Sequence, residues 1–141
     1  MKKLFALLVP LALLAACGRP ESGAADLTGA QFVKMQNDVV ITLNFDQSEN
    51  MVSGRIVNNF RGPYEIDGNN ISFGAFASTM MMGPENAMNI EQAFFQFMPT
   101  VHKFKLTDAS LYLFGEDGAF KIFDRVADIA GVCMPEEDCI E

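Results

Sequence analysis

The chain has 141 residues, half of them hydrophobic, with 10 basic and 18 acidic side chains and a formal net charge of −8. A chain of this length forms a single domain with a sizeable core. Its acidic balance argues against nucleic acid as a partner, because phosphate binding requires clustered Lys and Arg, and an anionic membrane surface would also repel it.

Residues 1–16 have the three-part pattern of a secretory signal peptide. Lys2 and Lys3 precede an apolar run over residues 4–14, and small residues follow. The apolar run is too short for a transmembrane helix. We therefore expect export from the cytoplasm and an oxidising compartment for the rest of the chain.

Residues 14–17 read Leu-Ala-Ala-Cys, which resembles the bacterial lipobox, where the cysteine is acylated and begins the mature chain. The alternative is an ordinary signal peptide with a coincidental cysteine. We expect lipidation of Cys17 with palmitate-type acyl chains, since several chains anchor a protein far more firmly than one. Gly18, in place of an aspartate, resembles the sorting pattern of outer-membrane lipoproteins and predicts the periplasmic face of that membrane. Residues 17–26 have the composition of a tether.

Residues 27–125 are predicted to form the folded domain, which begins with a series of strands. Over residues 39–45 apolar side chains alternate with others, the period of a half-buried strand. Asp, Asn, Ser and Gly residues between such segments indicate turns, which favours an antiparallel meander. The strands are expected over residues 31–36, 39–45, 51–57, 62–66 and 71–76.

Residues 54–64 read Gly-Arg-Ile-Val-Asn-Asn-Phe-Arg-Gly-Pro-Tyr. This segment resembles the motif of the META domain family, the family of the heat-shock protein HslJ, in which Gly, Cys-Asn, Phe, Gly and Tyr recur at this spacing. Two later landmarks of the family resemble Thr79 and the pair Glu91 and Phe94. The resemblance covers roughly residues 27–123, and it implies a curved sheet or open barrel on one helix and a role in stress tolerance.

The chain departs from the family pattern at three positions. Where the family has two cysteines thought to form a disulfide, this chain has Val57 and Gly83, and Met80 replaces an arginine. Loss of both cysteines fits loss of a structural crosslink, which forgoes up to about 3 kcal/mol of constraint on the unfolded chain. We expect Val57 and the methionines of residues 80–82 to fill the space by packing.

A helical period appears over residues 83–99. Gly83 is expected as N-cap and Pro84 as the first helical residue, and Pro99 ends the helix. One broad apolar arc is predicted to face the sheet. Its members are Ala87, Ile90, Ala93, Phe94, Phe97 and Met98.

Three further strands are expected over residues 101–106, 110–114 and 119–123, with a glycine-rich turn before the last. The predicted fold class is therefore α+β: an antiparallel curved β-sheet or open barrel of about seven or eight strands packed on a single α-helix. Residues 126–141 form a C-terminal extension. There Cys133 and Cys139 are expected to form a disulfide, with a metal site or free thiols as the alternatives.

No catalytic, cofactor or metal site is predicted. His102 is the only histidine and no further metal ligands gather near it in the sequence, so we expect a solvent-facing or strand-edge histidine. The alternative, an enzyme, would require a pocket that gathers His102 with acidic residues. Glu91 has two interpretations: an acid in a binding site, or a helix residue that hydrogen-bonds to neighbouring backbone near Thr79, which we favour. Several methionine and phenylalanine residues could form a surface that binds an apolar ligand or a partner protein, although we favour the alternative that they belong to the core. That surface comprises Met80, Met82, Met88, Phe94, Phe95 and Phe97.

The sequence thus predicts a non-enzymatic outer-membrane lipoprotein, anchored by Cys17, that contacts another envelope protein and acts in envelope maintenance or stress tolerance. The alternative is a binding module for an acyl chain or another small apolar ligand. A continuous cavity lined by Met80, Met82, Phe94 and Phe97 would favour this alternative, whereas a filled core would count against it.

Overall fold

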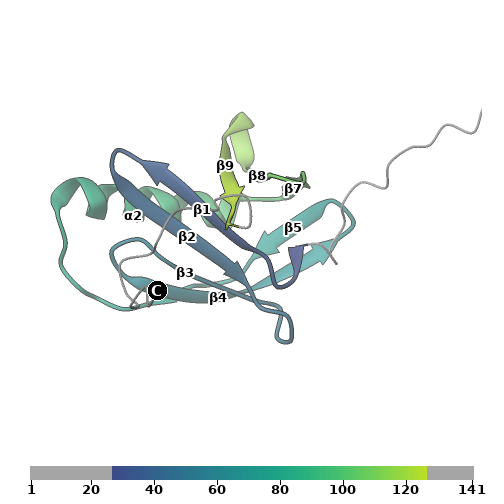
Figure 1. Cartoon of the computed structure of the whole chain (residues 1–141), viewed down its shortest axis with the longest axis horizontal. Helices are drawn as coiled ribbons and strands as arrows, with labels where there is room; N and C mark the ends of the chain where they lie inside the picture. The colour runs from purple at the N-terminus through teal and green to yellow at the C-terminus, as the bar shows by residue number, and fades with distance from the viewer. Residues whose placement is uncertain (1–26, 127–141) are drawn as a thin grey trace, which may run out of the picture.

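The structure, a computed structural model, describes residues 27–126 (Figure 1). The predictions for residues 1–26 and 127–141 lie outside the described residues. They concern the signal peptide, Cys17, the tether, and the cysteines Cys133 and Cys139.

Nine antiparallel strands form one sheet, and eight of them close into a barrel. In ring order these are β3, β2, β1, β9, β8, β7, β5 and β4, and the pairing of β3 with β4 closes the ring. The ninth strand, β6, pairs with β4 at Phe60 and Arg61. The strands are β1 (Gln31–Gln36), β2 (Val39–Phe45), β3 (Met51–Arg55), β4 (Asn59–Asp67), β5 (Asn70–Phe73), β6 (Ala77–Ser78), β7 (Lys103–Leu106), β8 (Ser110–Phe114) and β9 (Phe120–Arg125).

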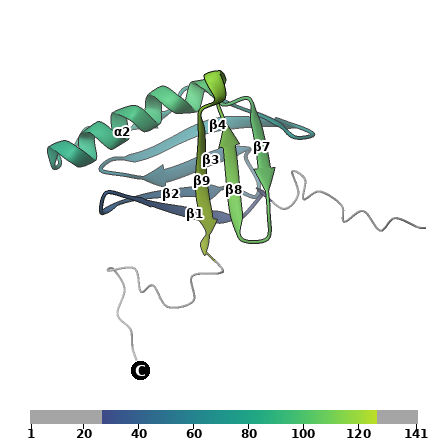
Figure 2. The ribbon, with the colours of Figure 1, turned by 90° about the horizontal axis from the view of Figure 1, so that it is seen from above.

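The predicted α+β class is confirmed, with the sheet closed rather than open. The axes of the antiparallel strands β1–β4 are roughly aligned and β7–β9 cross them, so the barrel resembles two layers of sheet joined at their edges (Figure 2). β5 and β7 pair over a short stretch, at Asn70 and Lys103. The sheet changes direction here, so that its two layers enclose one core between them.

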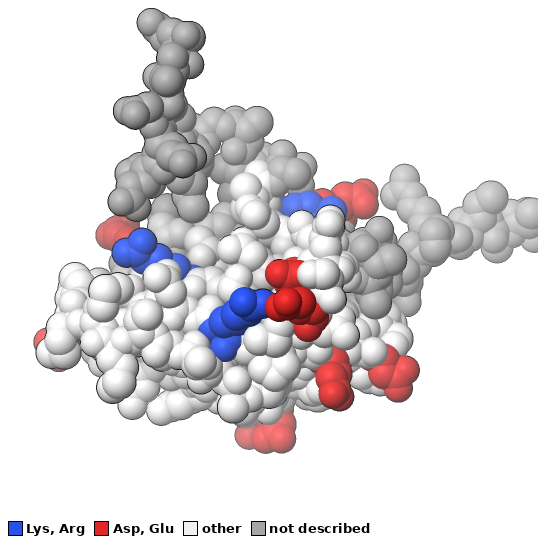
Figure 3. Space-filling model, turned by 90° about the horizontal axis from the view of Figure 1, so that it is seen from below, with Lys and Arg blue, Asp and Glu red and all other residues white. Residues whose placement is uncertain are grey.

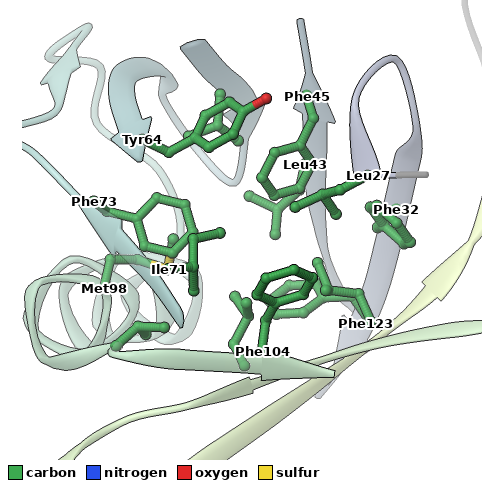
Figure 4. Packing of buried hydrophobic residues seen from close by; sticks show 14 of the residues in the cluster. Leu27, Phe32, Leu43, Phe45, Tyr64, Ile71, Phe73, Met98, Phe104 and Phe123 are labelled. Carbon is green, nitrogen blue, oxygen red and sulfur yellow. The ribbon is translucent and has the colours of Figure 1, made fainter. Parts of the chain in front are cut away.

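Alternation along each strand places apolar side chains inside the barrel. On β4, Phe60, Gly62 and Tyr64 are buried while the residues between them are exposed. Side chains from both layers meet in one continuous core (Figure 4). Phe45 packs edge-on against Phe32 and Tyr64, with ring centroids 5.9 and 5.1 Å apart.

Gly54 on β3 is required by a close approach of backbones. A Cβ atom at this position would lie 1.9 Å from the carbonyl oxygen of Thr42 and 2.6 Å from the Phe60 ring. Only glycine fits without moving a strand, which gives the first glycine of the motif over residues 54–64 a physical reason.

The α-helix, α2 (Glu85–Phe97), begins one residue later than predicted and is followed by a 3-10 turn, η1 (Met98–Thr100). Pro84, not Gly83, is the N-cap: its φ and ψ of −56° and 143° are extended, and its carbonyl accepts the first helical hydrogen bond, from Met88. No helix among residues 27–126 is long and apolar enough to cross a membrane.

The buried face of α2 differs in part from the predicted arc. Ala93 is exposed and Phe97 is only half-buried, whereas Glu91 is buried together with Ala87, Ile90 and Phe94. Phe94 stacks on Phe60 of β4 with ring centroids 5.1 Å apart. The helix thus lies beside β4 and reaches toward the β8–β9 end of the barrel (Figure 2). The shift toward Glu91 follows from its hydrogen bonds to the turn between β3 and β4.

Candidate functional site

The buried carboxylate of Glu91 binds the turn between β3 and β4. Its Oε2 atom accepts hydrogen bonds from the backbone N–H groups of Val57 and Asn58, at 3.0 and 2.7 Å. Its Oε1 atom accepts one from the side-chain Nδ2 of Asn58, at 2.7 Å. Glu91 and Asn58 are 6% and 3% exposed, so these bonds are shielded from water. Hydrogen bonds to a charged acceptor are the stronger kind, which explains why the helix buries an acid here.

Asn58 in turn holds the loop that leads into α2. Its Oδ1 atom accepts hydrogen bonds from Thr79 Oγ1 at 3.0 Å and from the Met81 backbone N–H at 2.5 Å. Its Nδ2 atom also donates to the Met81 carbonyl at 3.3 Å. Thr79 Oγ1 accepts a further bond from the Asn59 N–H at 3.1 Å. The loop over residues 79–83 is therefore fixed at Thr79 and at Met81.

Three segments that are far apart in sequence meet in this network. Asn58 comes from the β3–β4 turn, Thr79 from the loop after β6, and Glu91 from α2. The sequence pointed to Thr79 and Glu91 as neighbours, and its structural interpretation of Glu91 as a partner of backbone groups is confirmed. It missed Asn58 as their common partner. The asparagine of the motif over residues 54–64 was the available signal.

Val57 and Gly83 lie in contact beside this network. A Cβ atom built on Gly83 would lie 3.5 Å from Val57 Cβ and 2.7 Å from Val57 Cγ1. Disulfide-bonded cysteines have Cβ atoms about 3.5–4.5 Å apart. The two positions thus have the spacing of a crosslink, and the valine methyl groups occupy the space over the glycine, as predicted for Val57. Met80 and Met82, which were also expected to fill this space, are exposed instead.

A groove of about 620 Å³ lies between the loop over residues 79–83 and the outer side of α2. All three loop methionines, Met80, Met81 and Met82, line it, and Met88 and Phe95 of α2 line it from the other side. Met80 and Met82 are 96% and 94% exposed. These two methionines are therefore not core residues, and their sulfur atoms and methyl groups are presented to solvent.

The predicted apolar surface is only partly assembled. Met80, Met82, Met88 and Phe95 share the groove, but Phe94 is completely buried beneath it. Phe97 lies under the ammonium group of Lys121 on β9, with the nitrogen 5.1 Å from its ring centroid. Met80, Met82, Phe94 and Phe97 therefore do not line a joint cavity of the kind that would favour an enclosed ligand. The interior of the barrel is occupied by the core cluster (Figure 4).

The groove carries little charge. Its lining includes no Lys or Arg, its remaining polar residues are mainly Asn, Gln, Ser and Thr, and its one ionisable group is the hydrogen-bonded Glu91. On the face seen in Figure 3, acidic side chains lie mostly toward the right and lower edges of the view, with Lys and Arg side chains among them. Arg61 and Glu49 form an exposed ion pair between β4 and the β2–β3 turn.

A second hollow, of about 560 Å³, lies over β7 and the β8–β9 turn and gathers His102 with Lys103, Lys105, Glu116 and Asp117. All five side chains are exposed. The described contacts of His102 include one long contact to the Thr100 carbonyl, at 3.5 Å, and no bond to a carboxylate. A histidine oriented by an acid, the arrangement used in nucleophilic catalysis, is thus not formed within residues 27–126. The same residues contain no cluster of three or more His, Cys, Asp or Glu suited to a metal.

Comparison with known proteins agrees with this architecture. The sequence model of the META domain family matches residues 24–128. An NMR structure of a protein from Burkholderia xenovorans is 20% identical, covers 70% of this chain and 83% of its own, and has a TM-score of 0.62. A second protein solved by NMR is 17% identical, covers 75% of this chain and 96% of its own, and has a TM-score of 0.59. These similarities concern the fold. The search of curated proteins found no significant match.

Proposed function

Since the chain belongs to the META domain family, we propose that it is a non-enzymatic outer-membrane lipoprotein that acts in envelope maintenance or stress tolerance by contacting another envelope protein. The stress role comes from the family resemblance to the heat-shock protein HslJ. The location comes from the lipobox-like residues 14–17 and from Gly18. In this proposal acyl chains on Cys17 hold the domain at the periplasmic face of the membrane.

The observation that carries the proposal is the exposure of Met80 and Met82 on a loop that is fixed in place. Large apolar side chains that remain almost fully exposed are candidates for contact with a partner. Methionine suits such a surface, because its unbranched, polarisable side chain adapts to different partners. The two hydrogen bonds between Asn58 and Met81 reduce the entropy that the loop would lose on binding.

The chemistry of the groove defines the partner that fits it. Met80, Met82 and Phe95 offer apolar contacts, while the amides of Gln92 and Gln96 offer hydrogen bonds at the edge. A protein segment with an apolar side and uncharged polar neighbours matches this lining. A strongly charged segment would lose hydration on docking without gaining an ion pair.

The acyl-chain or small apolar ligand remains the alternative within the same groove. Its apolar lining from Met80, Met82 and Phe95 is compatible with such a ligand, but the filled barrel makes an enclosed ligand less favourable than a surface contact. Native and denaturing mass spectra of protein purified from its own envelope separate the two. A stoichiometric small mass lost on denaturation would favour the ligand.

The decisive experiment compares charged substitutions in cells that lack the native gene copy. Met80→Glu/Met82→Glu places charge on the groove without touching the core, so we expect it to fail to restore resistance to envelope stress. Met35→Glu is the matched control, because Met35 is 70% exposed on β1 and does not line the groove. A photo-crosslinker at Asn89, on the groove, should form an adduct with an envelope protein that Met80→Glu/Met82→Glu abolishes. Full complementation by Met80→Glu/Met82→Glu would overturn the proposal.

A further inference from the structure

We propose that the thioethers of Met80, Met81, Met82 and Met88 form a binding site for a soft monovalent metal ion, of which Cu(I) is the natural candidate. This inference concerns the sulfur atoms of the groove and does not depend on a protein partner. No metal site is predicted from the His and Cys residues of the sequence. The sequence places Met80, Met81 and Met82 side by side, and the fold adds Met88 from the opposite side of the groove.

The four methionines come from two elements that face one another across the groove. Met80, Met81 and Met82 follow one another on the loop, and Met88 lies one turn into α2. Each thioether sits at the end of a flexible side chain with three rotatable bonds, so several sulfurs can turn toward one ion. Thioether and thiolate ligands select Cu(I) over the harder divalent ions, which prefer oxygen and imidazole.

The exposure of the loop methionines fits a ligand role better than a packing role. Met80 and Met82 are 96% and 94% exposed, so they contribute little to the core. Their backbone is nevertheless held, because Asn58 hydrogen-bonds to both the N–H and the carbonyl of Met81 between them. Because this backbone is fixed, less conformational freedom is lost when the mobile thioether ends turn toward one ion.

The electrostatics of the groove also favour a single positive charge. Thioethers are neutral, so a bound monovalent ion keeps its charge and needs surroundings without competing cations. The groove is lined by no Lys or Arg, and its one ionisable residue is Glu91, whose carboxylate is bound by Val57 and Asn58. The net charge of the whole chain, −8, adds a general attraction for cations.

Binding is tested with Ag(I), a redox-stable ion of the same charge and softness, followed by native mass spectrometry. The sample is the chain released from its predicted signal peptide, with Cys17→Ser, Cys133→Ser and Cys139→Ser so that no thiol contributes. We expect a single bound Ag(I) ion, and Cu(I) binding in anaerobic competition with a chromophoric chelator. No binding of either ion at micromolar concentration would overturn the proposal.

Leucine substitutions identify the ligands, because leucine keeps the apolar volume of methionine and removes the sulfur. Met80→Leu/Met82→Leu should weaken binding about tenfold or more, and Met88→Leu should weaken it as well. Met35→Leu removes an exposed thioether outside the groove and should leave binding unchanged. Equal binding by Met80→Leu/Met82→Leu and the parent chain would show that the ion binds elsewhere and would also overturn the proposal.

The same variants separate this inference from the proposed function. Met80→Leu/Met82→Leu should retain partner contact while losing the metal, whereas Met80→Glu/Met82→Glu should lose the partner contact. Mild oxidation gives an independent readout, since conversion of Met80 and Met82 to sulfoxides replaces a soft sulfur donor by a polar group. Ag(I) binding should fall in step with the sulfoxide content of these two residues and recover after enzymatic reduction.

Discussion

Glu91 on α2 accepts hydrogen bonds from both the backbone N–H and the side-chain amide of Asn58, each at 2.7 Å. This pair joins the helix to the β3–β4 turn. Asn58 extends the connection to the loop over residues 79–83 through Thr79 and Met81. The position of the exposed methionines in the groove therefore depends on a buried polar network that includes residues distant in the sequence.

Glu91→Gln should destabilise the domain by about 1–3 kcal/mol, because an amide replaces one of the two acceptor oxygens and leaves a buried donor of Asn58 or Val57 unsatisfied. Chemical denaturation followed by circular dichroism measures the change in unfolding free energy. Glu85→Gln, on the exposed first turn of the same helix, is the control and should change stability by less than about 0.5 kcal/mol. Equal effects of the two substitutions would contradict a structural role for the network.

Val57→Cys/Gly83→Cys should form a disulfide and stabilise the domain by about 3 kcal/mol, since the bridge would close a loop of about 26 residues in the unfolded chain. The 3.5 Å separation of Val57 Cβ from a Cβ built on Gly83 permits the bond. Gly83 does not have a positive φ, so a side chain causes no backbone strain there. Denaturation with and without reductant measures the gain.

Gly83→Ala alone tests the same contact between positions 57 and 83, but here we expect a loss of stability. The new methyl group would lie 2.7 Å from Val57 Cγ1, so crowding should destabilise the domain by about 1 kcal/mol or more. Val57→Ala/Gly83→Ala should relieve this crowding. If Gly83→Ala were neutral and the double cysteine variant stayed reduced in air, the two positions would not be in contact in solution.

Lys121 should make stability rise with pH in the alkaline range. Burial, and secondarily the charge of Lys34, lowers the pKa of Lys121 in the folded chain. In the unfolded chain its pKa is near the ordinary value of about 10.4. Between these two values the unfolded chain binds more protons, so folding becomes more favourable as the pH rises through this window.

The measurement compares the unfolding free energies of the parent chain and Lys121→Gln from pH 8 to pH 11. Taking the difference removes the titration of other groups. The parent should gain stability relative to Lys121→Gln as the pH increases. A difference that is constant across this range would show that Lys121 titrates alike in the folded and unfolded chains.

Cys17→Ser should release the protein from the membrane fraction, because the predicted acyl chains have no other attachment site. Cell fractionation and immunoblotting measure the distribution, and metabolic labelling with a palmitate analogue reports acylation directly. Cys133→Ser, which changes a cysteine outside the predicted lipobox, serves as the control. Unchanged membrane retention of Cys17→Ser would argue against acyl anchoring.

The sequence by itself determined the repeating local features of the domain. Alternation over residues 39–45 predicted β2 with its correct bounds, and the glycine-rich turn before residue 119 predicted the β8–β9 hairpin. These features depend on neighbouring residues, so a pattern of period two and a turn signal are sufficient to indicate them. The family motifs extended this to the fold class and to the positions of a missing crosslink.

Only the tertiary structure decided which hydrogen bonds Glu91 and Asn58 form and which methionines are exposed to solvent. Helical periodicity placed Ala93 on the buried face and left Glu91 at its border, but the donors of Val57 and Asn58 draw Glu91 inside. Closure of the barrel likewise required the pairing of β3 with β4 and of β5 with β7. Methionine occurs both in cores and on adaptable surfaces, and the sequence favoured the core for Met80 and Met82, whereas both are exposed. Their exposure follows from where Asn58 fixes the loop, which is a contact between segments more than 20 residues apart.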